Sequence, residues 1–277
     1  MLGAKVAQFA MERKLPKGHD LAIRIMNVDE SELFQRFIGK EFLRKGSLRR
    51  YTLNDLQSFT LSRFWPPELM RYEGKAVVMD PDIFCRVDIR ELFKMDLKGH
   101  ALAACKKKDA WDTSVMLLDC SKLRHWKLSQ WIEGLAEKRV DYHDIMTLQR
   151  ETSVTPLSRV WNSLEYLDDS IKMLHTTDRL TQPWKTGLNI DFTRNPMPRI
   201  LGVIPREWLH KMMGRYPNTY QPHPDKANEE FVFELFSDAF KAGAISEELV
   251  LDEIEKQNLR PDFLTILKEG IGLSLNS

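Results

Sequence analysis

Two aspartates separated by a single residue offer the clearest chemistry in this sequence. Asp80 and Asp82 directly follow the apolar run at residues 75–79, whose length and composition are typical of a buried strand. Side chains at positions i and i+2 of an extended chain point to the same side, and Pro81 keeps Asp80 extended. The two carboxylates can therefore converge on one hard divalent cation, Mg²⁺ or Mn²⁺, which would neutralise a diphosphate leaving group.

A simpler interpretation of the same pair stays open. An aspartate in a loop often caps the turn that follows it, and Asp-x-Asp is a short motif. The strand before the motif favours the metal site, because open α/β sheets bind ligands at the carboxyl ends of their strands. The sequence contains no GxGxxG, Walker, GxSxG or HExxH signature that would indicate another catalytic class.

Short apolar segments alternate with helical patterns through most of the chain. Strands are predicted at residues 21–28, 75–79, 100–105 and 114–118, and helices at residues 3–14, 31–37, 52–65, 88–94, 128–137 and 144–149. The basic segment at residues 44–50 is predicted to be a loop. Strands interleaved with helices indicate an α/β fold in which helices flank a sheet.

The C-terminal part of the chain has only helical patterns. Helices are predicted to begin at Pro205, which suits a first helical position, and at residues 228–242, 246–257 and 261–268. We therefore expect an α/β domain at residues 1–199 and a helical C-terminal extension at residues 200–277.

Four blocks of sequence, taken in order, resemble glycosyltransferase family 8. Residues 59–64 (FTLSRF) look like the helix whose arginine faces the donor sugar, and residues 72–93 look like the strand, Asp-x-Asp and Asp-Ile-x-Glu-Leu-Phe helix of the family. Residues 111–118 (WDTSVMLL) resemble its Asn-Ser-Gly-Val-Met-Leu strand, and residues 174–184 its His-x-x-Gly…Lys-Pro-Trp motif. The resemblance implies the nucleotide-sugar-binding GT-A fold, a Rossmann-like mixed sheet flanked by helices.

The resemblance also implies a metal and donor site. Asp80 and Asp82 would bind Mn²⁺ (or Mg²⁺) and, through it, the diphosphate of a nucleotide-diphosphate sugar, and His175 would be the third metal ligand. Neutral imidazole is an acceptable partner of carboxylates on such an ion. Arg63 would contact the donor or steady the metal-side carboxylates. Taken alone, His175 on an apolar strand is more often a structural histidine than a metal ligand, and Arg63 could simply form a surface ion pair.

Two further aspartates are candidate catalytic residues by the same resemblance. Asp144 aligns with a donor-sugar contact of the family, although its other interpretation is a helix N-cap before Ile145. Asp112 stands in the strand block where the family has asparagine, and Thr113-Ser114 leaves no glycine for a close approach to the sugar.

Other departures from the family bear on the donor and on the start of the chain. Asp178 replaces a glycine and Gln182 replaces the lysine that grips the diphosphate. Lys185 or Arg179 could supply that positive charge instead, because a phosphate needs a cation rather than one fixed position. The chain opens on a helix, so we expect the family's first nucleotide-binding strand to be absent and the first domain to be truncated at its N-terminus.

Composition excludes several other classes of protein. Lys and Arg number 41 against 40 Asp and Glu, a net charge of +1, which argues against a nucleic-acid partner. No apolar stretch reaches the roughly 20 residues that span a bilayer, and no secretory signal is visible, so we expect a cytoplasmic protein. The three cysteines form no CxxC pair, which indicates neither a disulfide framework nor a zinc site. Basic clusters at residues 44–50 and 106–108 are solvated faces or, alternatively, peripheral contacts to an anionic acceptor or membrane.

The leading hypothesis is a metal-dependent glycosyltransferase. It would move a hexose from a nucleotide-diphosphate sugar, expected to be a UDP-sugar, to a carbohydrate, glycolipid or glycoprotein acceptor in polysaccharide or glycan synthesis. The resemblance implies retention of the anomeric configuration. The competing hypotheses are a catalytically inactive relative that binds a glycan or a protein and, with less support, a nucleotidyltransferase that uses Asp-x-Asp.

Overall fold

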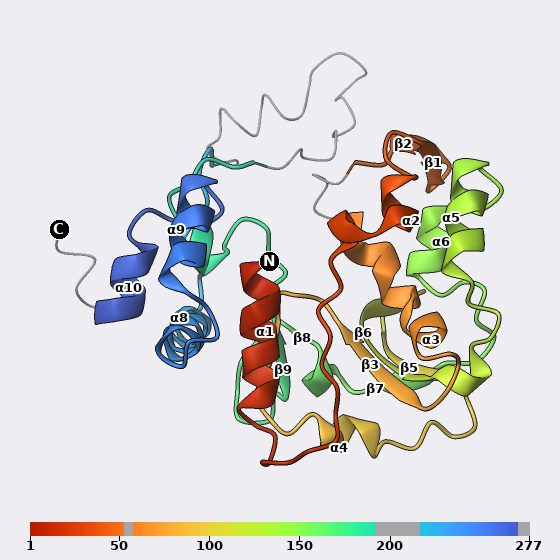
Figure 1. The fold of residues 1–277 in the computed structure, drawn as a ribbon, viewed down its shortest axis with the longest axis horizontal. Helices are drawn as coiled ribbons and strands as arrows, with labels where there is room; N and C mark the ends of the chain where they lie inside the picture. Colours follow the sequence, from red (N-terminus) through yellow and green to blue (C-terminus); the bar gives the residue numbers. More distant parts are fainter. Residues whose placement is uncertain (53–57, 192–216, 271–277) are drawn as a thin grey trace. The chain divides into compact units, whose positions relative to one another are not determined.

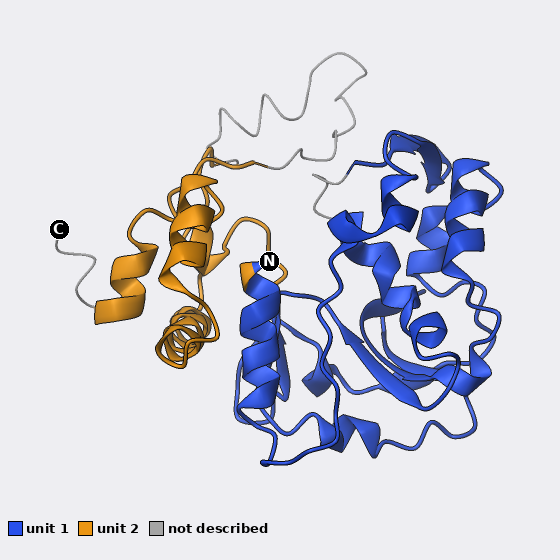
Figure 2. Ribbon diagram, viewed as in Figure 1, with its two compact units in different colours: residues 1, 3–175 blue, residues 2, 176–277 orange. Residues whose placement is uncertain are grey.

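The computed structural model describes residues 1–52, 58–191 and 217–270. Contacts divide the chain into two compact units (Figure 2): unit 1 holds residues 1 and 3–175, and unit 2 holds residues 2 and 176–277. The boundary predicted between residues 199 and 200 lies outside the described residues, so these domain limits stay a prediction.

Unit 1 is built on two principal sheets and a hairpin (Figure 1). The strands are β1 (Glu41–Arg44), β2 (Ser47–Arg50), β3 (Lys75–Met79), β4 (Ile83–Cys85), β5 (Leu102–Lys106), β6 (Trp111–Asp119), β7 (Thr155–Leu157), β8 (Ser163–Leu164) and β9 (Met173–His175). The four-stranded sheet has the order β3-β6-β5-β7 and the three-stranded sheet the order β4-β9-β8. Antiparallel and parallel pairs occur in both sheets, so both are mixed.

Strand β6 is the centre of unit 1 because it is buried on both faces. Met116 and Leu118 contribute to one apolar cluster together with Trp126, while Val115 and Leu117 contribute to a second cluster on the opposite face. This alternation follows from the two-residue period of a strand. The middle of β6, residues 115–118, is apolar at four successive positions, and such a run must be covered on both sides.

Short helices supply that cover. The helices of unit 1 are α1 (Leu2–Glu12), α2 (Glu32–Gln35), α3 (Pro66–Leu69), α4 (Arg90–Phe93), α5 (Leu128–Ala136) and α6 (Tyr142–Met146), with 3₁₀ turns η1 (Val28–Glu30), η2 (Ser58–Phe64), η3 (Cys120–Lys122) and η4 (Arg159–Trp161). Figure 1 shows α2, α5 and α6 on one side of the four-stranded sheet and α4 on the other. The predicted class, a mixed α/β sheet flanked by helices, is confirmed.

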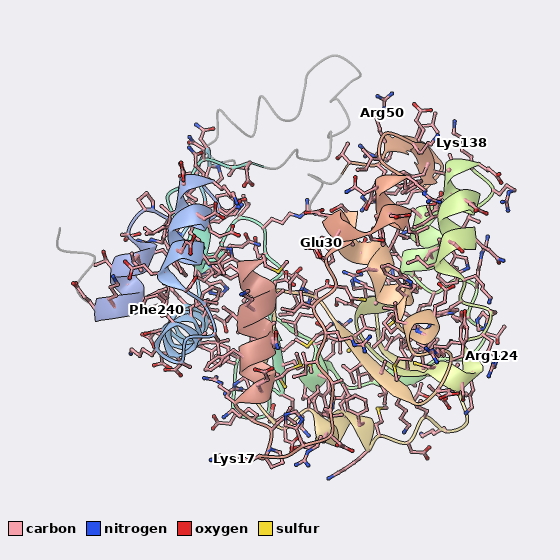
Figure 3. All side chains as sticks on the ribbon, in the orientation of Figure 1. Lys17, Glu30, Arg50, Arg124, Lys138 and Phe240 are labelled. Carbon is pink, nitrogen blue, oxygen red and sulfur yellow. The ribbon has the colours of Figure 1, made fainter. Side chains whose placement is uncertain are left out.

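Several predicted elements are confirmed in place, and others are wrong or differ in type. The strand at residues 75–79 is β3 and the helix at residues 128–137 is α5, one residue shorter. Residues 21–27 form no strand, because a short apolar run needs a partner edge as well as a pattern. The basic segment 44–50 is a hairpin rather than a loop: β1 pairs with β2, all four residues of β2 are exposed, and Arg50 extends from its end (Figure 3).

Unit 2 is mainly helical in its described part, as predicted for the C-terminal region. It contains the 3₁₀ turn η5 (Pro183–Lys185) and helices α8 (Lys226–Lys241), α9 (Glu247–Glu255) and α10 (Phe263–Glu269). Phe236 of α8 and Phe263 of α10 pack edge to face with ring centroids 5.5 Å apart. The helix predicted at Pro205 lies outside the described residues. No helix in the described part of the chain is long and apolar enough to cross a membrane.

The three cysteines allow a direct test of whether the core of unit 1 excludes solvent. Cys85, Cys105 and Cys120 are free thiols with no exposed surface, and burial raises the pKa of each to about 11. Because the thiolate is the reactive form, we expect no reaction of the native protein with a thiol-specific chromogenic disulfide at pH 8. All three thiols should react after denaturation. Release of one equivalent from the native protein would show that one of these sites opens.

Candidate functional site

Three predicted metal ligands meet at one place in unit 1. One ligand atom each from Asp80, Asp82 and His175 lie within 4.8 Å of one another. Asp80 directly follows β3 and Asp82 directly precedes β4, while His175 ends β9 opposite Ile83 of β4. The antiparallel pairing of β4 with β9 therefore brings a residue from the far end of unit 1 to the Asp-Pro-Asp turn, and Nε2 of His175 lies 3.5 Å from Oδ1 of Asp82.

Arg63 holds the first aspartate in place. Its Nε donates to Oδ1 of Asp80 at 2.8 Å and its Nη2 donates to Oδ2 of the same carboxylate. Its Nη1 donates to Oγ1 of Thr113 at 2.9 Å, and that hydroxyl donates in turn to the carbonyl of Met146. The structure therefore shows an ion pair between Arg63 and Asp80, while the expected roles of Arg63 toward a donor or a metal stay predictions.

Burial and charge compete at this cluster. Burial raises the pKa of Asp80 to about 6, against the lowering effect of Arg63, and the neighbouring charge of Asp82 adds to the rise. Burial would lower the pKa of His175, but the hydrogen bond and charge of Asp82, with the charge of Asp80, raise it above the ordinary value. Two crowded carboxylates that gain from a nearby positive charge suit a divalent cation.

The residues present fit such a cation. Two carboxylates and an imidazole match the donor preferences of Mn²⁺, and carboxylates also match those of Mg²⁺. Each carboxylate oxygen has two lone pairs, so Asp80 retains acceptor capacity beside Arg63. Nδ1 of His175 is engaged by Oδ1 of Asn162 at 2.9 Å, and the opposite ring nitrogen, Nε2, faces Asp82.

The glycine near the start of α1 permits close approach to the Asp-Pro-Asp turn. A Cβ atom on Gly3 would lie 3.0 Å from the carbonyl oxygen of Pro81. Such a distance is tighter than normal packing, so an alanine at this position would have to displace the turn that carries the two aspartates. Gly3 thus lets α1 pack closely against the turn.

Asp112, the second candidate catalytic residue, has its carboxylate held by neighbouring residues, and its catalytic role stays a prediction. Its Oδ1 accepts hydrogen bonds from the backbone N–H and the hydroxyl of Ser114, and its Oδ2 lies 3.1 Å from Nζ of Lys107 and 3.4 Å from Nη1 of Arg159. Burial alone would raise the pKa of Asp112, but the bonds from Ser114 and the charge of Lys107 lower it to about 2. The carboxylate is therefore ionised and fully engaged.

The structure places Asp144 inside α6 rather than at its start. The helix is capped by Asp141, whose Oδ1 accepts from the N–H of His143 at 2.7 Å, so the N-cap interpretation belongs to Asp141. Asp144 lines a small pocket together with Trp131 and Glu151. A contact between Asp144 and the donor sugar stays a prediction.

Lys185 belongs to unit 2 and is already engaged there. Its ammonium group pairs with the carboxylate of Asp191 and lies 5.2 Å from the centroid of the Tyr220 ring. Arg179 also lies in unit 2 and is exposed. The diphosphate contact suggested for these two residues stays a prediction.

Sequence reasoning missed Asn162, which has no exposed surface. It contacts His175 on one side, and its Nδ2 donates to Oγ of Ser114 at 2.9 Å on the other. The only signal in the sequence was an asparagine directly after the apolar pair Val160-Trp161. A polar residue beside apolar ones can be buried with them, and a buried polar side chain must find hydrogen-bond partners.

Comparison with known proteins gives one match to a family and several to solved structures. The model described as glycosyl transferase family 8 matches residues 18–162, just over half of the chain. The galactosyltransferase LgtC, solved in complex with donor and acceptor sugar analogs, is 17% identical with a TM-score of 0.45, and the match covers 66% of this chain and 85% of LgtC. The glycosyltransferase GlyE of Streptococcus pneumoniae TIGR4 is 16% identical with a TM-score of 0.46, covering 81% and 62%. The apo bifunctional glycosyltransferase WbbM is 14% identical with a TM-score of 0.46, covering 67% and 45%. No curated protein matches the sequence.

The charge of Asp112 should make a pH-dependent contribution to stability. A carboxyl pKa near 2 in the folded protein, against an ordinary value of 3.8, corresponds to roughly 2–3 kcal/mol of stabilisation at neutral pH. We expect Asp112→Asn to lower the free energy of unfolding in urea by about this amount at pH 7. Because the folded pKa is depressed, the difference from the wild type should be constant above about pH 4 and shrink as the pH falls toward 2.

Asp119 at the other end of β6 provides a matched control. It accepts from Ser121 two residues later at 2.6 Å and pairs with Lys122, as Asp112 does with Ser114 and Lys107, but its side chain is 21% exposed against 6% for Asp112. Asp119→Asn should therefore cost less than Asp112→Asn. Equal losses in the two variants would contradict the assigned strength of the Asp112 network.

Proposed function

Because the chain belongs to glycosyl transferase family 8 and is therefore a glycosyltransferase, we propose that it moves a hexose from a nucleotide-diphosphate sugar, most simply a UDP-sugar, to an acceptor hydroxyl. The acceptor would be a carbohydrate, a glycolipid or a glycoprotein. The proposal includes dependence on a divalent cation and retention of the anomeric configuration.

The convergence of Asp80, Asp82 and His175 carries the metal part of the proposal. These residues come from three separate strand ends, yet one ligand atom of each falls within a 4.8 Å cluster. Asp82 and His175 would bind the cation directly, and Asp80 would do so while Arg63 fixes the plane of its carboxylate. When bound, the cation would neutralise the negative charge that develops on the diphosphate leaving group.

The roles of the other candidates follow from their surroundings. Asp144 is the proposed contact to the donor sugar, and Lys185 the proposed contact to the diphosphate. Asp112 has its carboxylate engaged by Ser114, Lys107 and Arg159, so we assign it to positioning rather than to direct contact with the donor. Arg63 is assigned to support of Asp80.

Variants of the three proposed ligands test the function. We expect Asp82→Asn and His175→Gln to reduce Mn²⁺-dependent release of UDP from a panel of UDP-sugars by at least the 10–100-fold that loss of an outer-shell partner costs. Chelation of the metal should abolish the wild-type activity, and Mn²⁺ should restore it. These two substitutions are preferred to Asp80→Ala, which would leave the buried guanidinium of Arg63 without its carboxylate and cost about 3–5 kcal/mol of stability.

Asp119→Asn serves as the control, since Asp119 is the last residue of β6, at the opposite end of the strand from Asp112, and the variant should retain full activity. Unchanged turnover in Asp82→Asn and His175→Gln would remove the metal role. Calorimetry then distinguishes the alternative: a folded wild type that binds neither Mn²⁺ nor UDP-sugars would be an inactive relative that binds a glycan or a protein.

A further inference from the structure

A buried chain of hydrogen bonds runs from Asp112 to His175. The hydroxyl of Ser114 lies 2.6 Å from Oδ1 of Asp112, Nδ2 of Asn162 lies 2.9 Å from that hydroxyl, and Oδ1 of Asn162 lies 2.9 Å from Nδ1 of His175. All four residues are buried, with 0–6% of their surface exposed. Three hydrogen bonds therefore connect a charged residue at the start of β6 to a proposed metal ligand.

The charge on Asp112 determines which group donates and which accepts in each of these hydrogen bonds. Lys107 and Arg159 pair with its Oδ2, and its pKa of about 2 keeps the group ionised. An ionised carboxylate only accepts hydrogen bonds, so the single proton of the Ser114 hydroxyl must point to Asp112. The oxygen of Ser114 then has only lone pairs to offer to its other neighbour.

That direction fixes the amide of Asn162. The group that faces Ser114 must be a donor, which is the NH₂ of the amide, and its carbonyl oxygen therefore faces His175. A carbonyl oxygen accepts, so Nδ1 of His175 must carry the proton. In a neutral imidazole the opposite nitrogen, Nε2, then has the free lone pair, and this is the atom that faces Asp82.

We propose that Asp112, Ser114 and Asn162 form a positioning relay that holds His175 as its Nδ1–H tautomer and presents Nε2 to a divalent cation. The inference rests on the proposed function, because it concerns the same metal site. None of the three residues contacts the cation in this scheme. They act through His175, as outer-shell partners that set the tautomer and orientation of a metal-ligating histidine.

The relay predicts what an uncharged residue at position 112 would do. In Asp112→Asn the amide can donate to Ser114 as well as accept from it, so Ser114 can turn its proton toward Asn162 and the amide of Asn162 can reverse. We expect the imidazole of His175 to become a mixture of both tautomers. Ser114→Ala removes the middle of the chain without changing any charge and should have the same effect.

Nitrogen-15 NMR of histidine-labelled, metal-free protein measures the tautomer directly. Spectra recorded at a pH high enough that the histidine signals no longer change with pH, so that the imidazole is neutral, resolve the two ring nitrogens. His175→Gln identifies the signals of His175 among the seven histidines of the chain. The wild type and the Asp119→Asn control should show Nδ1–H alone. A wild-type signal from Nε2–H, or an unchanged tautomer in both Asp112→Asn and Ser114→Ala, would overturn the relay.

Binding of Mn²⁺, followed by electron paramagnetic resonance of the free ion, gives the second readout. We expect the dissociation constant to rise about 10–100-fold in Asp112→Asn and Ser114→Ala and to stay at the wild-type value in Asp119→Asn. Wild-type affinity in the first two variants would overturn the positioning role. If the wild type itself binds no Mn²⁺, the proposed metal dependence fails, and the relay is judged on the tautomer alone.

Discussion

The antiparallel pairing of β3 with β6 is the constraint on which the site depends. The register sets Met79 opposite Val115, and the N–H of Asp80 continues the pairing by donating to the carbonyl of Ser114 at 3.1 Å. The end of one strand therefore lies beside the start of the other. This single register places the Asp-Pro-Asp turn next to the polar segment Asp112-Thr113-Ser114. A one-residue slip would turn every side chain of β3 to the opposite face of the sheet and separate Asp80 from its partners.

The buried ion pair between Arg63 and Asp80 fixes the orientation of the Asp80 carboxylate. Removing two charges from water costs several kcal/mol per ion, and their attraction repays this only with good geometry. Here the geometry is bidentate, and Thr113 takes a further guanidinium donor. A carboxylate fixed in this way would need little reorganisation to bind the proposed cation.

Patterns within short stretches of sequence were sufficient to predict the elements that each depend on one such stretch. The apolar run before Asp80 and the amphipathic period of α5 follow directly from burial on one side or both, and the sequence blocks around Asp80, Asp112 and His175 pointed to the family that the match confirms. The hairpin β1–β2 was taken for a loop because its second strand is exposed throughout and so carries no alternation of apolar and polar residues.

Contacts between segments far apart in the chain could not be predicted from the sequence. Asn162 lies 13 residues from His175 and 48 from Ser114, and no periodicity relates these positions. Their meeting depends on the β4-β9-β8 sheet, whose strands are only two or three residues long. Strands this short leave little pattern to detect, and their pairing is decided by the tertiary structure. For the same reason the sequence analysis identified Asp112 only as a candidate catalytic residue and could not predict its contacts with Ser114, Lys107 and Arg159.

A relay of two neutral groups has an electrostatic advantage over a direct contact between aspartate and histidine. A carboxylate bonded straight to Nδ1 of His175 would fix the same tautomer, but it would add a third negative charge beside Asp80 and Asp82. The pKa of Asp80 is already raised in part by the charge of Asp82, and a further carboxylate would raise it more. Because Ser114 and Asn162 lie between Asp112 and His175, the negative charge of Asp112 is not placed directly beside the metal site. That charge is also compensated by Lys107 and Arg159. The histidine thus receives the orientation that a charged partner gives while the two aspartates stay free of its repulsion.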